Sequence, residues 1–535
     1  MRTTTEPQRG SASVGYAAST LYVASIVVVV AIARARNGEF AYPLDDPYIH
    51  LRLAQNLLDG TLGLNVDEFA SASSSPAWPV LIAAVASVTG PRVGVPLLLA
   101  VVAGVGLLLG VDRWARRLGM GTALRSGQMA VILLLMPLPA VTLTGMEHVL
   151  QAGLVFLVAS MVVERTCGPP SSGGPGRQDL MLALATAAAA AVRFELVFVL
   201  VPASLLLLWR RRWWSVLAAW LGAAVPVCAT ALVNLGQGWP ALPTPLIAKS
   251  ITGRDAAGLQ RLLPGLPAPS PDHVRVWLPA LLLVGLWFFS HRSMAERWPV
   301  RATAWSSIAL GATVLHYGFV QVGALYRYEA YLVVLLSGAL AVSLHAVTTD
   351  AVALDVLRRT PTAARLAAFA LVAVTLVGSL GSFALVMRGM TEVHLQQLQM
   401  ARFMRESCPG CTVVVNDIGA VAMYGGGRII DDYGLASEQV LDAKLDGTWD
   451  TDAVDALARR EGADLAMVYD TAYWLPGVPD EWDPIGTWSL DHHVAVADEE
   501  VSLFSLDPTR TDELRRAFER FDLAPEVEVR VHPQP

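Results

Sequence analysis

Apolar runs of residues recur along the first three quarters of the chain and stop near residue 388. Several runs are shorter than the ~20 residues of a simple transmembrane helix, so we expect those to be tilted, broken or re-entrant. The pattern predicts a polytopic α-helical membrane protein of about 11 spans, the first of them retained because no convincing cleavage site follows it. The runs lie at residues 17–33, 93–111, 126–141, 149–163, 180–192, 196–209, 214–233, 276–290, 302–322, 330–346 and 366–387.

Residues 77–89 are also apolar, but they are few and bounded by prolines. We expect them to form a surface helix within the first extracytoplasmic loop, residues 36–92. With this segment left out of the count, the loops on one side of the membrane collect most arginines, which predicts a cytoplasmic N-terminus and an outer C-terminus. These arginines are Arg2, Arg9, Arg113, Arg116, Arg117, Arg125, Arg165, Arg177, Arg210, Arg211, Arg212, Arg292, Arg297, Arg301, Arg358, Arg359 and Arg365.

The loops on the opposite side carry a distinctive set of charges, which are sparse elsewhere in the apolar part. Each charge alone would fit a helix cap or a side chain reaching toward water, but together on one face they favour a shared polar cavity. The segments concerned are Asp45-Asp46, Gly145-Met146-Glu147-His148, Arg193-Phe194-Glu195, the loop that contains Lys249, and Tyr326-Arg327-Tyr328-Glu329.

Asp45 and Asp46 stand out because they directly follow the first span and precede Pro47 and a short helical pattern. Acids beside the end of a span are costly unless they face water or a cavity, so they form a functional hypothesis. The alternative is that one of them is an ordinary helix N-cap.

After residue 388 the pattern changes to short β-branched runs that alternate with helical segments. It predicts a small extracytoplasmic α/β domain over residues 389–535, after a membrane domain over residues 1–388. The expected strands are 412–416, 428–431 and 464–469, with a hairpin at 494–506. The expected helices are 453–461 and 511–521.

Composition agrees with a membrane protein, since 54% of the 535 residues are hydrophobic, 16% are charged and the mean hydropathy is +0.47. The net charge of −7 and the lack of basic blocks argue against a nucleic-acid partner. Cys408 and Cys411 open the outer domain, and this spacing fits a disulfide, a redox pair or half a zinc site. Outside the cytoplasm a disulfide is the favoured reading.

The order of these motifs resembles that of GT-C membrane glycosyltransferases, in particular the terminal arabinofuranosyltransferases of the cell wall and their uncharacterised relatives. Two positions depart from the pattern: Arg193-Phe194-Glu195 stands where relatives often read Arg-Pro-Glu, and Thr244-Pro245-Leu246 replaces an Asn-Ser/Thr motif. The motifs that carry the resemblance are Asp45-Asp46, Ser75-Pro76-Ala77-Trp78-Pro79, Gly145-Met146-Glu147, Arg193-Phe194-Glu195, the loop ending at Lys249, Tyr326-Arg327-Tyr328 and Asn416-Asp417-Ile418-Gly419.

The resemblance implies transfer of a sugar from a polyprenyl-phosphate donor to a hydroxyl of a cell-envelope glycan, lipid or protein, at the outer face of a bacterial plasma membrane. Asp46, or else Asp45, would accept the acceptor's proton, and a divalent cation bridging the two to phosphate would fit. No other metal site is expected. Cations for the donor phosphate are Arg193, Lys249 and Arg327; Glu147, Glu195 and His50 are further substrate-binding candidates.

Other functions would also need a polar cavity in a membrane protein. A transporter or flippase of lipid-linked sugars is the main alternative, although the chain shows no inverted repeat that would favour transport. A polysaccharide polymerase or ligase, or a non-catalytic assembly scaffold, also remains open. The sequence leaves the donor sugar, the acceptor and the role of the outer domain undetermined.

Overall fold

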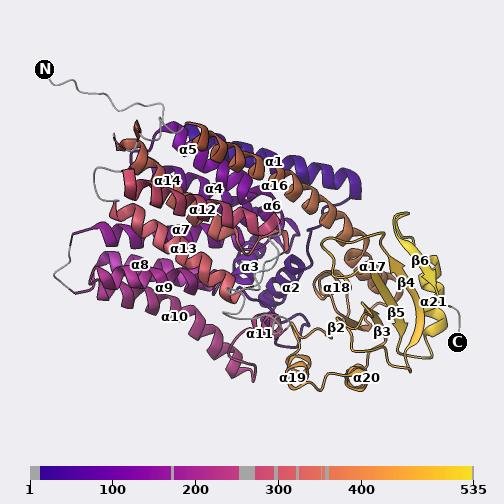
Figure 1. The fold of residues 1–535 in the computed structure, drawn as a ribbon. Coiled ribbons are helices and arrows are strands. Elements are labelled where there is room, and N and C mark those ends of the chain that lie inside the picture. The colour runs from indigo at the N-terminus through magenta and orange to yellow at the C-terminus, as the bar shows by residue number, and fades with distance from the viewer. Residues whose placement is uncertain are drawn as a thin grey trace.

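The computed structural model describes residues 13–532 apart from 170–173, 252–270, 294–298, 321–323, 351, 353 and 356–360. A bundle of long helices makes up most of the molecule, and a sheet domain lies beyond one end of it (Figure 1). The chain is therefore a polytopic helical membrane protein with a C-terminal α/β domain, as the sequence predicts.

Each predicted apolar run coincides with one bundle helix except the run 126–141, which is broken. There α5 continues as a π-helix (Val131–Leu135), and Pro137 separates it from α6. The bundle helices are α1 (Ser13–Asn37), α4 (Gly94–Arg117), α5 (Thr122–Ala130), α6 (Leu138–Leu143), α7 (His148–Cys167), α8 (Arg177–Val192), α9 (Leu196–Trp209), α10 (Trp213–Gly236), α12 (Pro271–Ser293), α13 (Val300–Phe319), α14 (Ala330–Thr349) and α16 (Pro361–Leu395).

Within the described part of the chain, α1, α4, α7, α10 and α14 are long and apolar enough to cross a membrane. The total of about 11 spans stays a prediction. Helix α14 is the centre of the bundle, because 83% of its most apolar 18-residue stretch is buried. In α10 only 17% of the corresponding stretch is buried. An apolar helix that hides so little of its surface in protein must present the rest to lipid.

Close packing around α14 depends on a glycine. A Cβ at Gly338 would lie 3.0 Å from the Phe156 ring and 3.1 Å from the Trp305 ring. These rings are themselves paired, with centroids 5.1 Å apart. The absence of a side chain at position 338 thus lets α14 approach α7 and α13 closely.

Three short helices occupy the junction between the bundle and the sheet domain: α2 (Asp46–Leu58), α3 (Ala77–Thr89) and α11 (Thr244–Ile251). Helix α3 is the predicted separate helix, although its place relative to a membrane stays a prediction. It packs against α2, and its buried Trp78 donates from Nε1 to the carbonyl of Gly145 at 3.2 Å.

The sheet has the strand order β2-β1-β3-β5-β4-β6. Strand β1 runs parallel to β2 and β3, and the other pairings are antiparallel. The elements of this domain are α17 (Gln397–Ser407), β1 (Thr412–Val415), α18 (Gly419–Tyr424), β2 (Arg428–Asp431), α19 (Glu438–Asp446), α20 (Thr451–Arg460), β3 (Leu465–Val468), β4 (Asp483–Ser489), β5 (Glu500–Ser505), α21 (Thr511–Arg520) and β6 (Glu528–Val531).

The expected strands and helices of this domain are present, but the hairpin prediction is wrong. Residues 494–506 contain only β5, whose antiparallel partner β4 lies upstream at Asp483–Ser489. The loop between them is long, so local turn signals did not reveal the pairing.

Alternate residues of the central strands point to opposite faces of the sheet. Val413 and Val415 belong to the core that includes Phe403 of α17 and Phe518 of α21. Val414 belongs to a second core with residues of α19 and α20. Helices therefore cover both faces of the parallel part of the sheet.

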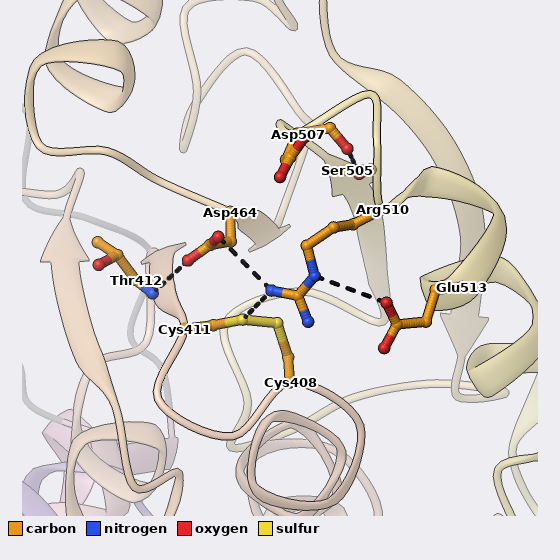
Figure 2. The surroundings of a disulfide bond; sticks show 8 residues. All are labelled: Cys408, Cys411, Thr412, Asp464, Ser505, Asp507, Arg510 and Glu513. Carbon is orange, nitrogen blue, oxygen red and sulfur yellow. Dashed lines mark hydrogen bonds and ion pairs between the residues drawn. A yellow bond between two sulfur atoms is a disulfide. The ribbon is translucent and has the colours of Figure 1, made fainter.

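Cys408 and Cys411 form a disulfide between the end of α17 and the start of β1 (Figure 2). Both are buried. Arg510 donates from Nη1 to the Cys411 sulfur at 3.0 Å and pairs with Asp464 at 3.5 Å, while Asp464 accepts from the Thr412 amide at 2.9 Å (Figure 2). The bridge thus fixes the first strand against the helix that enters the domain.

A buried acid makes this domain sensitive to pH. Asp432 follows β2 and accepts from Asn416 Nδ2 at 2.9 Å on both carboxylate oxygens. Burial raises the pKa of Asp432 to about 8, against the opposing effect of Lys444. Between its unfolded pKa of about 3.9 and pH 8, the folded state binds one proton more, so the free energy of unfolding falls as pH rises.

We predict that amide protection of β1 and β2 against hydrogen exchange, corrected for the intrinsic rate, is weaker at pH 8 than at pH 6. One proton corresponds to at most about a tenfold change in the opening equilibrium per pH unit. Asp432→Asn should flatten this dependence, whereas Asp446→Asn, at an exposed position of α19, should not. Equal pH dependence in wild type and Asp432→Asn would contradict the assignment.

Candidate active site

Asp46 begins α2 and forms an ion pair with Arg327, whose Nη1 lies 2.5 Å from Asp46 Oδ2. The side chain of Arg327 is 9% exposed and that of Asp46 is 30% exposed. Arg327 follows a turn in which Leu325 and Tyr326 both have positive φ angles, 57° and 61°. Non-glycine residues rarely adopt this conformation, and strained turns of this kind cluster at functional sites.

Arg193 lies beside this pair, in the short turn between α8 and α9. Its Nη1 donates to Glu147 Oε1 at 3.0 Å and to Ser74 Oγ at 2.9 Å. Its Nε donates to Glu195 Oε2 at 3.0 Å, and its Nη2 contacts the other oxygen of Glu195. Three segments far apart in the sequence, around Ser74, Glu147 and Arg193 itself, therefore meet at one buried guanidinium.

Tyr328 holds the two guanidinium groups in one place. The guanidinium carbon of Arg327 lies 5.1 Å from the centroid of the Tyr328 ring, and that of Arg193 lies 5.4 Å from it. The ring of His148 is 5.4 Å away on a tilted plane. Cation–π contacts of this length contribute about 0.5–2 kcal/mol each, so Tyr328 positions both arginines.

These side chains line one cavity between the bundle and the outer domain. Its volume is about 20 Å³, which is room for about one water molecule. A larger ligand can enter only if the lining moves. The lining residues are Asp46, Ile49, His50, Ala72, Ser74, Met146, His148, Arg193, Pro245, Arg327, Tyr328 and Leu435.

The two adjacent aspartates have different environments. Asp45 turns away from the cavity toward the outer domain, where its carboxylate accepts from the amides of Gly419 at 2.5 Å and Ala420 at 2.8 Å. It therefore caps α18 rather than α2. Of the two aspartates, Asp46 is the one that lines the cavity.

A third carboxylate, Asp417, comes from the outer domain. It accepts from Tyr469 Oη at 2.6 Å and Gln397 Nε2 at 2.7 Å. Burial raises the pKa of Asp417, these two hydrogen bonds oppose the rise, and the charge of Asp46 adds to it. Burial likewise raises the pKa of Asp45 well above its usual value, with Asp417 as the next cause. Of these acids, Asp46 is the one with a guanidinium bonded to its carboxylate within the described residues.

Of the residues predicted from sequence, the structure brings Asp46, His50, Arg193 and Arg327 together around the cavity. Glu147 and Glu195 lie behind Arg193 as its partners. Helix α11 contains Lys249, but the side chain of Lys249 lies outside the described part of the structure.

Sequence reasoning missed Ser74, Tyr328, His148 and Asp417 as members of the site. Tyr328, His148 and Asp417 lie within motifs that the sequence analysis singles out and Ser74 directly precedes one, so proximity to such a motif was the available signal. Their roles depend on contacts with residues more than a hundred positions away, such as Arg193 with Ser74.

The predicted divalent site between Asp45 and Asp46 is not assembled in this arrangement. Both Asp45 oxygens accept backbone amides, and Asp46 is paired with Arg327. In the residues that the structure describes, no group of three or more His, Cys, Asp or Glu side chains is arranged to hold a metal.

Comparison with solved structures finds membrane enzymes of similar fold. ArnT from Cupriavidus metallidurans, in a crystal structure bound to undecaprenyl phosphate, is similar with a TM-score of 0.54 and 14% identity, over 93% of this chain and 99% of that one. The apo structure of the same ArnT has a TM-score of 0.49 and 13% identity, with the same coverage of both chains. The Archaeoglobus fulgidus oligosaccharyltransferase in the apo form has a TM-score of 0.47 and 10% sequence identity, over 95% of this chain and 76% of that one. The likeness to lipid-bound ArnT confirms the GT-C fold expected from the motif order.

Residues 388–504 match the model of a family described as a domain of unknown function (DUF8728). No curated protein matches this chain in sequence. At the identities found, the structural likeness establishes the fold alone.

We predict that Asp45→Ala loosens the contact between α2 and α18. Two buried amides would lose their acceptor, at a cost of about 1–3 kcal/mol each. Gly419→Ala should have the same effect, because a Cβ there would lie 2.3 Å from the Asp45 carbonyl oxygen. Hydrogen exchange in residues 416–424 measures the loosening.

Asp46→Asn and Gly94→Ala are the controls for this experiment. The Asp46 carboxylate accepts from Arg327 on the cavity side of α2, and a Cβ at Gly94 would meet no described atom within 4 Å. Unchanged exchange of α18 in Asp45→Ala would show that Asp45 does not dock the outer domain.

Proposed function

We propose that the protein is a glycosyltransferase that moves a sugar from a polyprenyl-phosphate donor to a hydroxyl acceptor at the outer face of a bacterial plasma membrane. The observation that carries the proposal is the cavity in which the Asp46 carboxylate stands beside Arg327 and Arg193. The likeness in fold to ArnT, solved with undecaprenyl phosphate, supports a lipid-phosphate ligand.

In the proposed reaction, the acceptor oxygen attacks the anomeric carbon of the donor sugar. The bond between that carbon and the phosphate oxygen breaks, and its electron pair stays on the departing lipid phosphate. The acceptor proton passes to Asp46, a general-base role worth about 10²–10⁴-fold in rate. The two arginines stabilise the phosphate by charge-assisted hydrogen bonds.

The ion pair between Asp46 and Arg327 suggests an order of events. Arg327 pairs with the Asp46 carboxylate. A bound phosphate would compete for the same guanidinium and release Asp46 toward the acceptor hydroxyl. Donor binding would thereby also widen the narrow cavity.

Glu147 and Glu195 support this role without touching substrate. Glu147 is fully buried and Arg193 is 5% exposed, and a charge buried to that extent is stable only when paired and hydrogen-bonded. The two carboxylates therefore hold Arg193 in place, with its Nη1 also directed at Ser74.

The orientation in the membrane is part of the proposal. It rests on the arginine-rich loops that predict a cytoplasmic N-terminus and on the disulfide of the outer domain, which persists in oxidising compartments. A divalent cation remains a separate expectation, which chelator treatment of active enzyme would test.

The first test concerns the base. Asp46→Asn should lower sugar transfer from a panel of radiolabelled polyprenyl-phosphate sugars by about 10²-fold or more, with lipid still bound. Asp67→Asn, on the same loop with a side chain 83% exposed, is the matched control. Normal turnover of Asp46→Asn would remove Asp46 as base. Movement of the lipid-linked sugar across vesicles without transfer would favour a transporter.

The second test concerns donor binding. Arg327→Ala should weaken the binding of polyprenyl phosphate about ten- to a hundredfold, because a charge-assisted contact is worth about 1.5–3 kcal/mol. Tyr328→Leu should weaken it about two- to thirtyfold, while Tyr328→Phe keeps the ring and the affinity. Arg92→Ala, an exposed arginine of the first loop, is the control. Unchanged affinity in Arg327→Ala would exclude this arginine from the phosphate site.

The third test concerns topology. In a background with Cys167 and Cys228 replaced by serine, Val66→Cys should react with an impermeant thiol reagent applied to spheroplasts, since Val66 is 58% exposed. Thr122→Cys, exposed at the start of α5, should react only after the membrane is opened. Labelling of Thr122→Cys from outside would mean that residues 77–89 span the membrane.

A further inference from the structure

A second cavity lies outside the catalytic site, between the first loop and the outer domain. Its volume is about 240 Å³, near the lower end of the roughly 300–1,000 Å³ typical of small-molecule pockets. It is formed by the loop after α2, by Trp239 after α10, and by residues of β2, α19 and α20. We call it the loop–domain cleft.

The loop–domain cleft combines aromatic rings with groups that bind hydroxyls. Phe69 and Trp239 form an edge-to-face pair, with ring centroids 5.6 Å apart, and both are partly exposed. Flat apolar rings of this kind match the C–H face of a sugar ring. Such a site would use few polar groups around an apolar wall, as small-molecule pockets do.

The polar groups of the cleft are of both signs. Arg428 lies 3.1 Å from Glu68 and 3.4 Å from Glu461, and Arg460 lies 3.2 Å from Glu461. Gln439 accepts from Arg460 at 2.5 Å. Carboxylates accept from hydroxyls, guanidinium groups donate to them, and an amide does both. The lining contains the carboxylates of Glu68, Asp431, Glu438 and Glu461 but only two arginines. This excess of negative charge suits a neutral polyhydroxyl ligand better than an anion.

The cleft adjoins the catalytic cavity across a thin wall. Ala70 lines the cleft and Ala72 lines the catalytic cavity; in the same way Ala436 lines the cleft and Leu435 the cavity. The Thr244 hydroxyl donates toward the carbonyl oxygens of Ser71, at 3.1 Å, and of Leu435, at 2.5 Å. Two backbone segments tied together by one side chain therefore separate the two spaces.

Another cavity near the outer domain, with a volume of about 630 Å³, is lined by Tyr48, His394 and Arg402 among others. It lies on the far side of α2, because Tyr48 is about 200° around the helix from Asp46. Asp46, Ile49 and His50 face the catalytic cavity. The whole thickness of α2 thus stands between that larger cavity and the proposed base.

We propose that the loop–domain cleft binds a sugar unit of the acceptor, which makes the acceptor a neutral glycan rather than a single small alcohol. One unit lies against Trp239 and Phe69, and the chain continues past the wall of Ser71 and Leu435 to bring its reacting hydroxyl to Asp46. This assignment of the acceptor rests on the proposed function, whereas the sugar-binding property of the cleft does not.

The test measures binding to the full-length protein in detergent, without any donor. The probes are neutral trisaccharides of glucose, galactose, mannose and arabinose. Their binding is measured by saturation-transfer NMR and by calorimetry. At least one should bind with a dissociation constant in the millimolar range or tighter. Trp239→Ala and Glu461→Gln should each weaken it at least tenfold, while Trp239→Phe retains most of the affinity.

Matched controls exclude general effects of the substitutions. Trp209→Ala removes a tryptophan that is 65% exposed on α9, and Glu481→Gln neutralises a side chain that is 64% exposed on the outer domain. Neither should change the affinity. Failure of every trisaccharide to bind wild type, or equal binding by wild type, Trp239→Ala and Glu461→Gln, would overturn the proposal.

The outcome is separable from that of the proposed function. Asp46→Asn should bind the trisaccharide as wild type does while losing transfer. If binding depends on Trp239 but no sugar is ever transferred to the bound glycan, the cleft stands as a glycan site and the transferase assignment falls. If sugar transfer occurs at the same rate in wild type and Trp239→Ala, the transferase assignment is supported and the acceptor assignment is wrong.

Discussion

The need to pair buried charge organises the junction between the helices and the sheet domain. Arg193 could not remain in this place without Glu147 and Glu195, since a lone buried guanidinium would lose its hydration without compensation. To supply these partners, the ends of α6, α7, α8 and α9 must converge. Tyr328 then adds Arg327 to the same cluster, and Arg327 brings in Asp46. The cavity around Asp46 is a consequence of this chain of pairings.

The outer domain is attached to the same cluster by a second polar contact. Asp45 accepts the first amides of α18, and Gly419 allows the close approach. This contact sets the carboxyl ends of β1 and β2 against α2. Ligands of α/β sheets bind at such ends, and Asp417 is found there, directly after β1, whereas the loop–domain cleft runs along the edge strand β2. Neighbouring aspartates thus have separate tasks, one joining the domains and the other facing the cavity.

The fold alone would leave the chemistry open, because one fold serves many functions. At 14% identity, the likeness to ArnT describes how the helices run and not what they catalyse. The case for sugar transfer depends on the particular side chains around Asp46. The case for a glycan acceptor depends on a cleft built partly from the outer domain, most of which matches a family model described as a domain of unknown function.

Local patterns in the sequence determined the helices of the bundle and the strands β1, β2 and β3, and they predicted that the charged motifs lie on one face. Apolar periodicity and arginine counts need no knowledge of distant contacts. The local patterns also singled out Asp46, His50, Arg193 and Arg327. Only the tertiary structure decided that Asp45 docks a domain, that Ser74 and Tyr328 complete the arginine cluster, and that β5 pairs with β4 across a long loop. It also decided that Trp239 faces Phe69 in a cleft. Each of these depends on which distant surfaces meet, and that is settled by packing and charge pairing across the whole chain rather than by neighbours in sequence.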